Sequence, residues 1–109
     1  MKDDRLYLLH ISDCLARIER YVADGQEAFA NSEIIQDAVI RNLQTMAEST
    51  QRLSDAARSR RPEIEWRKIA GFRNVLAHDY LSVDLDKVWE IIERELPDLK
   101  RAIEALLQS

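Results

Sequence analysis

The densest cluster of chemically active side chains in this chain lies in one short segment, residues 71–80. Five such side chains occur within eight positions: Arg73, Asn74, His78, Asp79 and Tyr80. An imidazole titrates near neutral pH, so His78 can act as a general acid or a general base. A guanidinium stays charged, and its planar fork fits a phosphate group. Side chains of these types can move a proton and stabilise negative charge, so the segment is a candidate site for acid–base chemistry.

The spacing of these residues places them on different sides of a helix. Asn74 precedes His78 by four residues, so it shares a helix face with the ring and could orient it or hold a substrate oxygen. Arg73 precedes His78 by five residues, which corresponds to about 140° around the helix. A site that uses both side chains is therefore expected to be composite.

Each of these residues also has a purely structural interpretation. A histidine near a helix C-terminus commonly interacts favourably with the helix dipole. Arg73 can be a surface cation or a partner of Asp79, and Asn74 can satisfy a backbone group. Tyr80 can cover the end of a helix bundle as an aromatic plug.

Apolar residues at alternating steps of three and four predict helices along most of the chain. The first is expected over residues 3–23. Gly25, just after this range, can end the helix by adopting a left-handed conformation. The second is expected to run from a cap at Asn31 or Ser32 to Ala57.

The third expected helix, residues 63–78, carries the reactive cluster. Its apolar residues Ile69, Phe72 and Leu76 are expected to face the core. Gly71 lies in its middle, where glycine costs about 1 kcal/mol relative to alanine. We therefore expect another backbone to approach this helix closely at Gly71.

Asp84 is expected to cap a fourth helix. Its apolar stripe passes Pro97 in phase and continues to Leu106, which fits either one kinked helix or two consecutive helices. The pattern as a whole predicts an all-α fold, an antiparallel bundle of four to five helices in a single domain over residues 1–109.

The composition agrees with one small helical domain. The chain has 109 residues, a net charge of −4, and only two Gly and two Pro, which leaves little material for the turns of an all-β fold. No run of about 18 apolar residues is present. The acids at Asp3 and Asp4 also disfavour a signal peptide, so we expect a cytoplasmic protein.

The single cysteine excludes an internal disulfide. His10 and Cys14 are four residues apart and could coordinate a metal ion between them, but two ligands make a poor metal site. We expect no metal and no cofactor, and we expect Cys14 to be a small buried group beside Ile11 and Ile18.

Charge is distributed unevenly along the chain. Residues 58–73 contain six basic and two acidic residues, a local charge of +4, so the remainder carries −8. This stretch leads into the expected third helix, where it could attract phosphate; alternatively, it is an ordinary solvated loop.

The reactive segment reads R-x-x-x-x-H-x-Y, and it resembles the motif of the HEPN superfamily, more narrowly its HepT-like ribonuclease toxins. The flanking sequence is similar as well. Three further segments resemble the family pattern: Arg41-Asn42-Leu43 with Glu48, Pro62 to Trp66, and Asp84 to Leu107. The chain departs from the pattern at Ala47, where the family usually has glycine before this glutamate.

The resemblance implies a HEPN-like bundle that forms a twofold dimer, with higher oligomers a further option. In the family, Arg73, Asn74 and His78 of both chains would share one cleft and cleave cellular RNA, tRNA among the candidates, without a metal. Tyr80 would accept AMP from a minimal nucleotidyltransferase that acts as the antitoxin. Arg41, Asn42 and Glu48 would support the motif helix from behind, and Glu48 can also pair with Arg52 one turn on.

Two other functions stay open on the sequence alone. The domain can be an inactive helical module that recruits or positions a nucleotidyltransferase, or a structural helical dimer with neither role. The trio Arg73, Asn74 and His78 favours the enzyme, because a pure binding module has no need of it.

Overall fold

Helices make up the regular structure of the chain. The computed structural model describes residues 2–77 and 84–108, with the side chains of all of these except residues 2 and 74–77. Within these ranges there is no strand, which confirms the all-α prediction. The helices are α1 (Lys2–Tyr21), α2 (Gln26–Ala30), α3 (Glu33–Gln51), α4 (Asp55–Ser59), α5 (Trp66–Ala77), α6 (Leu85–Arg94) and α7 (Leu96–Gln108).

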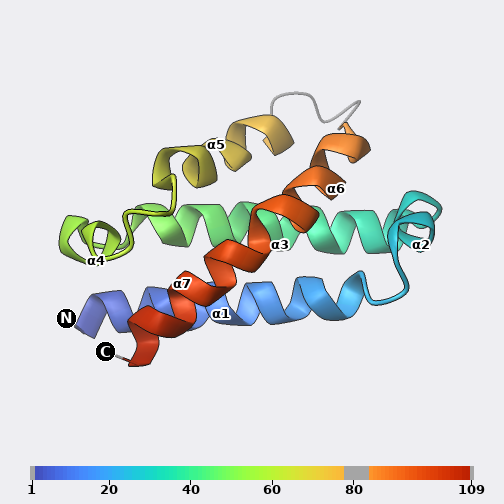
Figure 1. Ribbon diagram of the computed structural model, residues 1–109. Helices are drawn as coiled ribbons and strands as arrows, with labels where there is room; N and C mark the ends of the chain where they lie inside the picture. The colour runs from blue at the N-terminus through green and yellow to red at the C-terminus, as the bar shows by residue number, and fades with distance from the viewer. Residues whose placement is uncertain (1, 78–83, 109) are drawn as a thin grey trace.

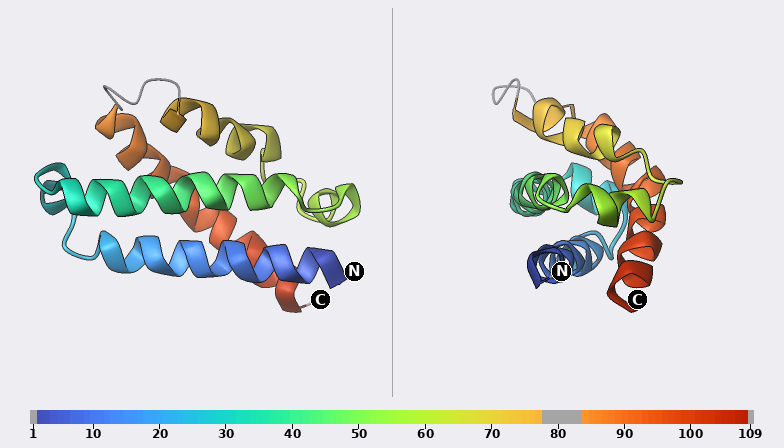
Figure 2. Two further views of the ribbon diagram at one scale, coloured as in Figure 1. Left: turned by 180° about the vertical axis from the view of Figure 1, so that it is seen from behind. Right: turned by 90° about the vertical axis from the view of Figure 1, so that its left-hand side faces the viewer.

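The five longer helices form two layers. Helices α1, α3 and α5 lie side by side, with α3 in the centre and antiparallel to both neighbours (Figure 1). Helices α6 and α7 follow one another and cross this layer diagonally on one side (Figure 2). The opposite face of the α1–α3–α5 layer is covered by no helix of the described chain (Figure 2).

The core lies between the two layers. The apolar stripe predicted for the first helix is buried, with Ile11 and Ile18 at most 1% exposed. On the crossing side, Val88 and Leu99 are fully buried. The short helix α2 joins this core through Phe29, whose ring centroid lies 5.4 Å from that of Trp89. Burying each such large apolar side chain stabilises the fold by roughly 1.5–3 kcal/mol.

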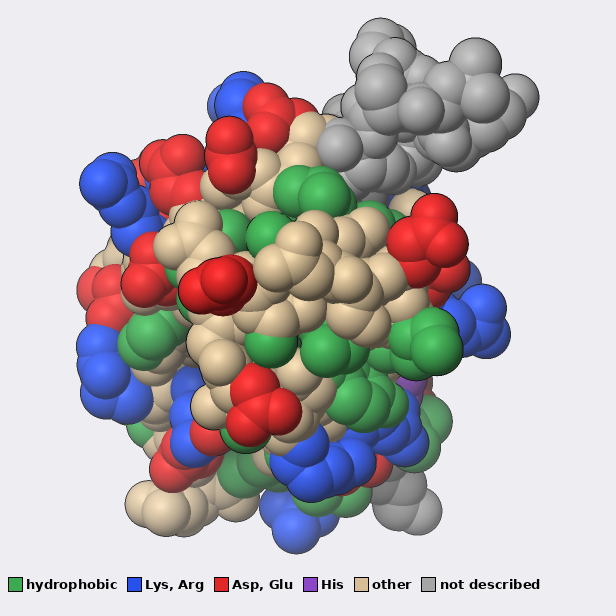
Figure 3. Space-filling model, turned by 90° about the vertical axis from the view of Figure 1, so that its right-hand side faces the viewer, with side chains coloured by type: hydrophobic (Ala, Val, Ile, Leu, Met, Phe, Trp, Pro, Cys, Tyr) green, Lys and Arg blue, Asp and Glu red, His purple; other side chains and the backbone are tan. Residues whose placement is uncertain are grey.

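The surface carries both charges and a few apolar groups. At the end of the molecule where α2 and α6 lie, acidic and basic side chains are intermixed (Figure 3). Three large apolar side chains are exposed on the described chain, Leu6, Leu9 and Ile34, the last of them 82% exposed. No described helix is long and apolar enough to cross a membrane.

The first two expected helices are partly corrected. Helix α1 already ends at Tyr21, and Gly25, with φ 95° and ψ −177°, is the N-cap of the five-residue helix α2, which was not predicted. Ser32 caps α3, accepting a hydrogen bond from the Ile35 amide at 3.2 Å. Helix α3 ends at Gln51 and not at Ala57, because the chain turns there and Ser54 caps the separate helix α4.

The third expected helix begins later than predicted. Helix α5 starts at Trp66 and not at residue 63, because residues 61–65 form a turn that buries Ile64. A β-carbon on Gly71 would meet no atom of the described chain within 4 Å, so the backbone approach expected there does not occur within this part of the protein.

The C-terminal region consists of two consecutive helices. Asp84 caps α6 as predicted, accepting hydrogen bonds from the amides of Asp86 and Lys87 at 3.1 and 3.2 Å. Helix α6 ends before Glu95, and Pro97 occupies the second position of α7, where its missing amide hydrogen is tolerated.

Candidate functional site

The motif helix α5 is held by its apolar face. Ile69 and Phe72 are 2% and 3% exposed and pack into the common core, as the sequence predicts. Helix α5 lies along α3, and its C-terminal end reaches the middle of α3 (Figure 1). Because Arg73 follows Phe72 by about 100° around the helix, its side chain emerges from the core and is exposed.

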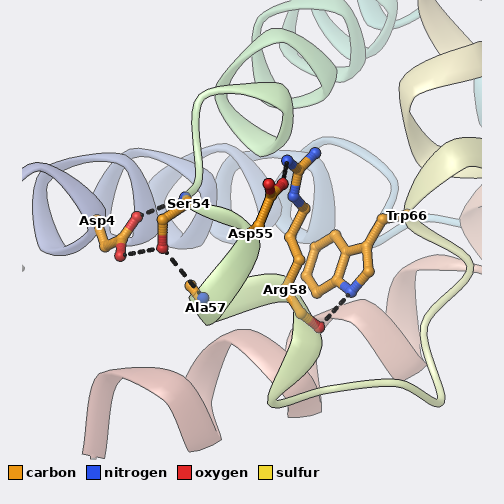
Figure 4. A network of polar contacts seen from close by, with 6 residues as sticks. All are labelled: Asp4, Ser54, Asp55, Ala57, Arg58 and Trp66. Atoms are coloured by element: carbon orange, nitrogen blue, oxygen red, sulfur yellow. Dashed lines mark hydrogen bonds and ion pairs between the residues drawn. The ribbon is translucent and has the colours of Figure 1, made fainter.

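The start of α5 is fixed by the indole of Trp66. Its Nε1 donates a hydrogen bond to the carbonyl oxygen of Arg58 at 3.0 Å (Figure 4). It also donates to the carbonyl oxygen of Arg61 at 3.1 Å. These carbonyls belong to the end of α4 and the turn after it, where each also accepts a backbone amide, from Arg61 at 3.0 Å and from Ile64 at 3.2 Å respectively. Trp66 therefore ties the motif helix to α4.

Helix α4 is in turn tied to the start of α1. The Asp4 carboxylate accepts hydrogen bonds from the Ser54 amide at 2.8 Å and from the Ser54 hydroxyl at 2.7 Å (Figure 4). The same hydroxyl accepts a hydrogen bond from the Ala57 amide at 3.1 Å, which caps α4. The hydrogen bonds from Ser54 lower the pKa of Asp4 below its usual value.

The other flank of α5 faces α6. Lys68 Nζ lies 2.7 Å from Glu95 Oε1 at the junction of α6 and α7, and this hydrogen bond and charge raise the pKa of Lys68. The two residues line an open groove of about 350 Å³, together with Gly71 and Phe72. Arg73, five residues after Lys68 and so about 140° around α5, lies on the flank turned away from this groove.

The expected catalytic residues are described to different extents. Arg73 is the one whose side chain the structure describes. Asn74 lies in helix α5, but its side chain lies outside the described part. His78 and the expected AMP acceptor Tyr80 lie outside the described residues altogether.

The expected supporting residues on α3 occupy two different environments. Asn42 is buried, 9% exposed, and its Nδ2 donates to the Ala38 carbonyl at 2.8 Å on its own helix. Arg41 and Glu48 are exposed, seven residues apart and hence on one face of α3. The ion pair expected between Glu48 and Arg52 is not formed between these two described residues.

A second polar cluster joins α1 to α3. Cys14 is fully buried, as predicted, and its Sγ lies 3.7 Å from His10 Nε2 and 3.6 Å from Thr45 Oγ1. His10 Nδ1 lies 2.6 Å from Ser49 Oγ. His10 therefore has hydrogen-bonding neighbours on both ring nitrogens, and the described residues hold no group of three or more side chains suited to a metal ion.

The basic stretch before and within α5 is partly neutralised. Three of its cations pair with carboxylates, Arg58 with Asp55 at 2.6 Å, Arg61 with Glu63 at 3.5 Å and Lys68 with Glu95 at 2.7 Å. The other three are exposed and have no ion-pair partner within residues 2–77 and 84–108; they are Arg60, Arg67 and Arg73. Residue spacing alone cannot separate the paired from the unpaired cations, because the pairing depends on how the turns fold.

Comparison with known proteins assigns the chain to a family. The model of the family described as "Ribonuclease HepT-like" matches residues 11–106. The chain belongs to the HepT-like family. The predicted resemblance is thereby confirmed, and the matched range covers α3, α5 and α6 in full and parts of α1 and α7 of this HepT-like chain.

Individual relatives of this HepT-like chain are similar over nearly all of its length. A "Putative RNase" from Caldanaerobacter subterraneus subsp. tengcongensis is 33% identical, with 99% of this chain and 97% of the relative aligned. The "mRNA nuclease HepT" from Shewanella oneidensis is 28% identical over 88% of this chain and 90% of the relative. No solved structure matches the chain significantly.

A further relative, from Methanocaldococcus jannaschii, is named "Gamma-glutamylcyclotransferase and putative RNase". It is 34% identical over 98% of this chain, and the chain spans about half of its length (49%).

Proposed function

We propose that this HepT-like chain is an endoribonuclease that acts on cellular RNA as the toxin of a toxin–antitoxin pair. The observation that carries the proposal is the placement of Arg73. It is exposed, has no ion-pair partner in the described chain, and is anchored on a rigid helix that continues into the family's motif. The names of the relatives, among them an mRNA nuclease, agree with an RNA substrate.

The proposed chemistry uses no metal ion. One His78 removes the proton from a ribose 2′-hydroxyl, whose oxygen then attacks the neighbouring phosphorus. The bond from phosphorus to the leaving 5′-oxygen breaks, and an imidazolium returns a proton to that oxygen. Arg73 stabilises the negative charge that develops on the phosphate oxygens, and Asn74 positions the ring or the substrate. The products are a 2′,3′-cyclic phosphate and a 5′-hydroxyl.

The proposed active form is a homodimer. His78 follows Arg73 by five residues in the sequence, and on a helix continued to position 78 this spacing would place them about 140° apart, on different sides. Two motif helices that meet across a twofold axis bring both residues into one cleft, where each chain contributes a histidine. The face of the α1–α3–α5 layer that no described helix covers offers room for such a partner (Figure 2).

The proposed regulation acts at Tyr80. A nucleotidyltransferase antitoxin transfers AMP from ATP to the tyrosine hydroxyl and releases pyrophosphate. The added group places bulk and negative charge beside the site and repels RNA phosphate. Mass spectrometry of the toxin, after incubation with the partner and ATP, tests this; Tyr80→Phe should stay unmodified and active with the partner present.

The enzyme proposal is tested by comparing wild type with His78→Ala in growth and on RNA. We expect wild-type expression to arrest growth and the purified protein to cut total RNA or tRNA, and we expect His78→Ala to do neither. If wild type with unmodified Tyr80 and the variant behave alike, the enzyme is excluded. Binding of a nucleotidyltransferase by both proteins would then show a recruiting module.

A further inference from the structure

A pocket of about 410 Å³ lies at the end of the molecule where α1 begins and α7 ends. Helix α4 lies at the same end, so three segments that are distant in the sequence enclose the pocket (Figure 1). Small-molecule sites commonly have volumes of about 300–1,000 Å³. None of the residues that line the pocket belongs to the motif segment 71–80, so the pocket is separate from the site proposed around Arg73.

The floor of the pocket is apolar. Leu8 of α1, Ala57 of α4 and Leu106 of α7 line it, and their side chains are buried, 5–6% exposed. Leu8 and Leu106 also belong to the common core, so the packing of the core fixes the floor. A rigid apolar floor suits the flat or aliphatic body of a small ligand.

Two arginines from separate elements line the same pocket. Arg5 lies near the start of α1, and Arg60 is the C-cap residue of α4. Both are exposed, and neither forms an ion pair within residues 2–77 and 84–108. Arg5 Nη1 lies 3.5 Å from the Leu107 carbonyl oxygen, which leaves most N–H donors of this guanidinium free. Two such groups beside one pocket favour a phosphate, because its oxygens match their planar forks.

The pocket also contains one acidic side chain, which is already hydrogen-bonded. One Asp4 carboxylate oxygen accepts from the Ser54 amide at 2.8 Å and the other from the Ser54 hydroxyl at 2.7 Å (Figure 4). A carboxylate has about four acceptor sites, so Asp4 can also accept from a ligand hydroxyl. With two arginines and one aspartate, the described lining carries a net charge of +1. The pocket therefore suits an anion that also carries hydroxyl groups and an apolar body.

We infer that the pocket binds a nucleoside 5′-monophosphate. The phosphate lies between Arg5 and Arg60, a ribose hydroxyl donates to Asp4, and the base packs against Leu8 and Leu106. A free nucleotide and the 5′-phosphorylated end of an RNA strand present the same chemistry, and the experiment separates them. The inference does not rest on the proposed ribonuclease function, because no residue of the motif takes part.

Calorimetric titration of the full chain with guanosine 5′-monophosphate (GMP) tests the inference. We expect GMP to bind wild type, and we expect Arg5→Ala and Arg60→Ala each to raise Kd about tenfold, the effect of losing one charged hydrogen-bonding group. Guanosine and inorganic phosphate should each bind at least about tenfold more weakly than GMP, since each lacks part of the contacts. GMP should also raise the melting temperature of wild type, because it binds the folded protein.

Two further variants control for access to the pocket and for net charge. Ala56 lines the pocket and is exposed, so Ala56→Phe fills the pocket, keeps both arginines and should abolish GMP binding. Arg17→Ala removes an exposed arginine of α1 that lies outside the pocket and has no ion-pair partner in the described chain, so it should bind GMP like wild type. Without GMP, the three arginine variants should melt like wild type, because the replaced side chains are exposed.

A 5′-phosphorylated RNA trinucleotide distinguishes the two sources of the ligand. It is titrated into the His78→Ala variant, which the proposed nuclease chemistry predicts will not cut it. Binding of the trinucleotide but not of GMP, with loss of binding when Arg5 or Arg60 is also replaced, supports the inference and identifies the end of a strand as the ligand. Binding of GMP with the same dependence supports it for the free nucleotide.

Three results would overturn the inference and leave the ribonuclease proposal untouched. The first is that neither GMP nor the trinucleotide binds, or that both bind Arg5→Ala and Arg60→Ala as tightly as wild type. The second is that inorganic phosphate binds as tightly as GMP, because the pocket would then hold any anion. The third is an equal loss of binding in Arg17→Ala, because the effect would then be one of net charge.

Discussion

At the scale of single residues, the basic side chains near α5 divide into structural and available cations. Arg58, Arg61 and Lys68 pair with acids at 2.6, 3.5 and 2.7 Å, and Arg73 has no such partner within the described chain. An unpaired, exposed guanidinium can bind phosphate without first breaking an ion pair. The role proposed for Arg73 follows from this difference.

Replacing Arg73 should therefore affect catalysis more than folding. We expect Arg73→Ala to lower kcat by about 10²–10³, the usual effect of removing one group that stabilises developing charge. Arg73→Lys should retain more activity than alanine but less than wild type, since the charge remains and the fork does not. Single-turnover cleavage of RNA measures both. A wild-type rate for Arg73→Ala would exclude the proposed role.

Among the helices, the motif helix α5 is positioned by two sets of hydrogen bonds. One set joins α1 to α4, and the other joins the end of α4 to α5. The contacts are the Asp4–Ser54 hydrogen bonds and the one from Trp66 to the Arg58 carbonyl (Figure 4), together with the one from Trp66 to the Arg61 carbonyl. Each joins the end of one helix to the next. Removing any of these hydrogen bonds should shift α5 and also lower the free energy of unfolding.

Trp66→Phe keeps an aromatic ring and removes the indole donor. We expect the free energy of unfolding to fall by about 1–2 kcal/mol, because two carbonyl groups lose a hydrogen-bond donor. Cleavage should fall as well, since small displacements of a catalytic group are costly. Denaturant unfolding and cleavage rates provide the measurements. Unchanged stability would show that the Trp66 hydrogen bonds do not hold α5.

The Asp4–Ser54 contact should make stability depend on acid pH. Because the pKa of Asp4 in the folded protein lies below its ordinary value of 3.8, the contact stabilises the fold above that value. This stabilisation should be lost as the pH falls through the folded pKa. Asp4→Asn should therefore be less stable than wild type at neutral pH, and the difference should shrink below about pH 4.

A matched variant on the same helix is Asp13→Asn, since Asp13 is exposed and makes no ion pair in the described chain. Its difference from wild type in denaturant unfolding should be small at both neutral and acid pH. If the deficit of Asp4→Asn stays constant from neutral pH to strongly acid pH, the contact does not depend on the charge of Asp4.

The elements also show which parts of the fold a local pattern can predict. The caps at Ser32 and Asp84 are confirmed, because each depends on neighbouring residues. The break between α3 and α4 was missed because Leu53 and Ala57 continue the apolar stripe and are buried. The contact that anchors the new helix joins Ser54 to a residue 50 positions away, beyond the reach of periodicity.

Sequence spacing and family resemblance named Arg73, Asn74 and His78 for the candidate site, and their roles stay predictions. The structure places the Arg73 side chain on α5, exposed. Which cations are neutralised could not be predicted, because Glu95 pairs with Lys68 only once α5 and α6 have packed together.

For the molecule as a whole, the proposed active site needs residues from two chains. Mixing two inactive variants, Arg73→Ala and His78→Ala, should restore partial activity after joint unfolding and refolding. In the mixed dimer the cleft receives Arg73 from one chain and His78 from the other. Analytical ultracentrifugation should show dimers for both variants alone. Mixed dimers without activity would show that each chain works with its own pair of residues.

We propose that this chain cuts RNA without a metal, by attack of a 2′-hydroxyl. The most direct measurement incubates the purified protein with an RNA oligonucleotide in chelator and identifies the product ends by mass spectrometry. We expect cleavage that leaves a 2′,3′-cyclic phosphate and a 5′-hydroxyl. We expect no cleavage when the ribose at the cut site lacks its 2′-hydroxyl. Cleavage of that deoxy-substituted oligonucleotide, or activity that appears only when a divalent metal is added, would contradict the proposal.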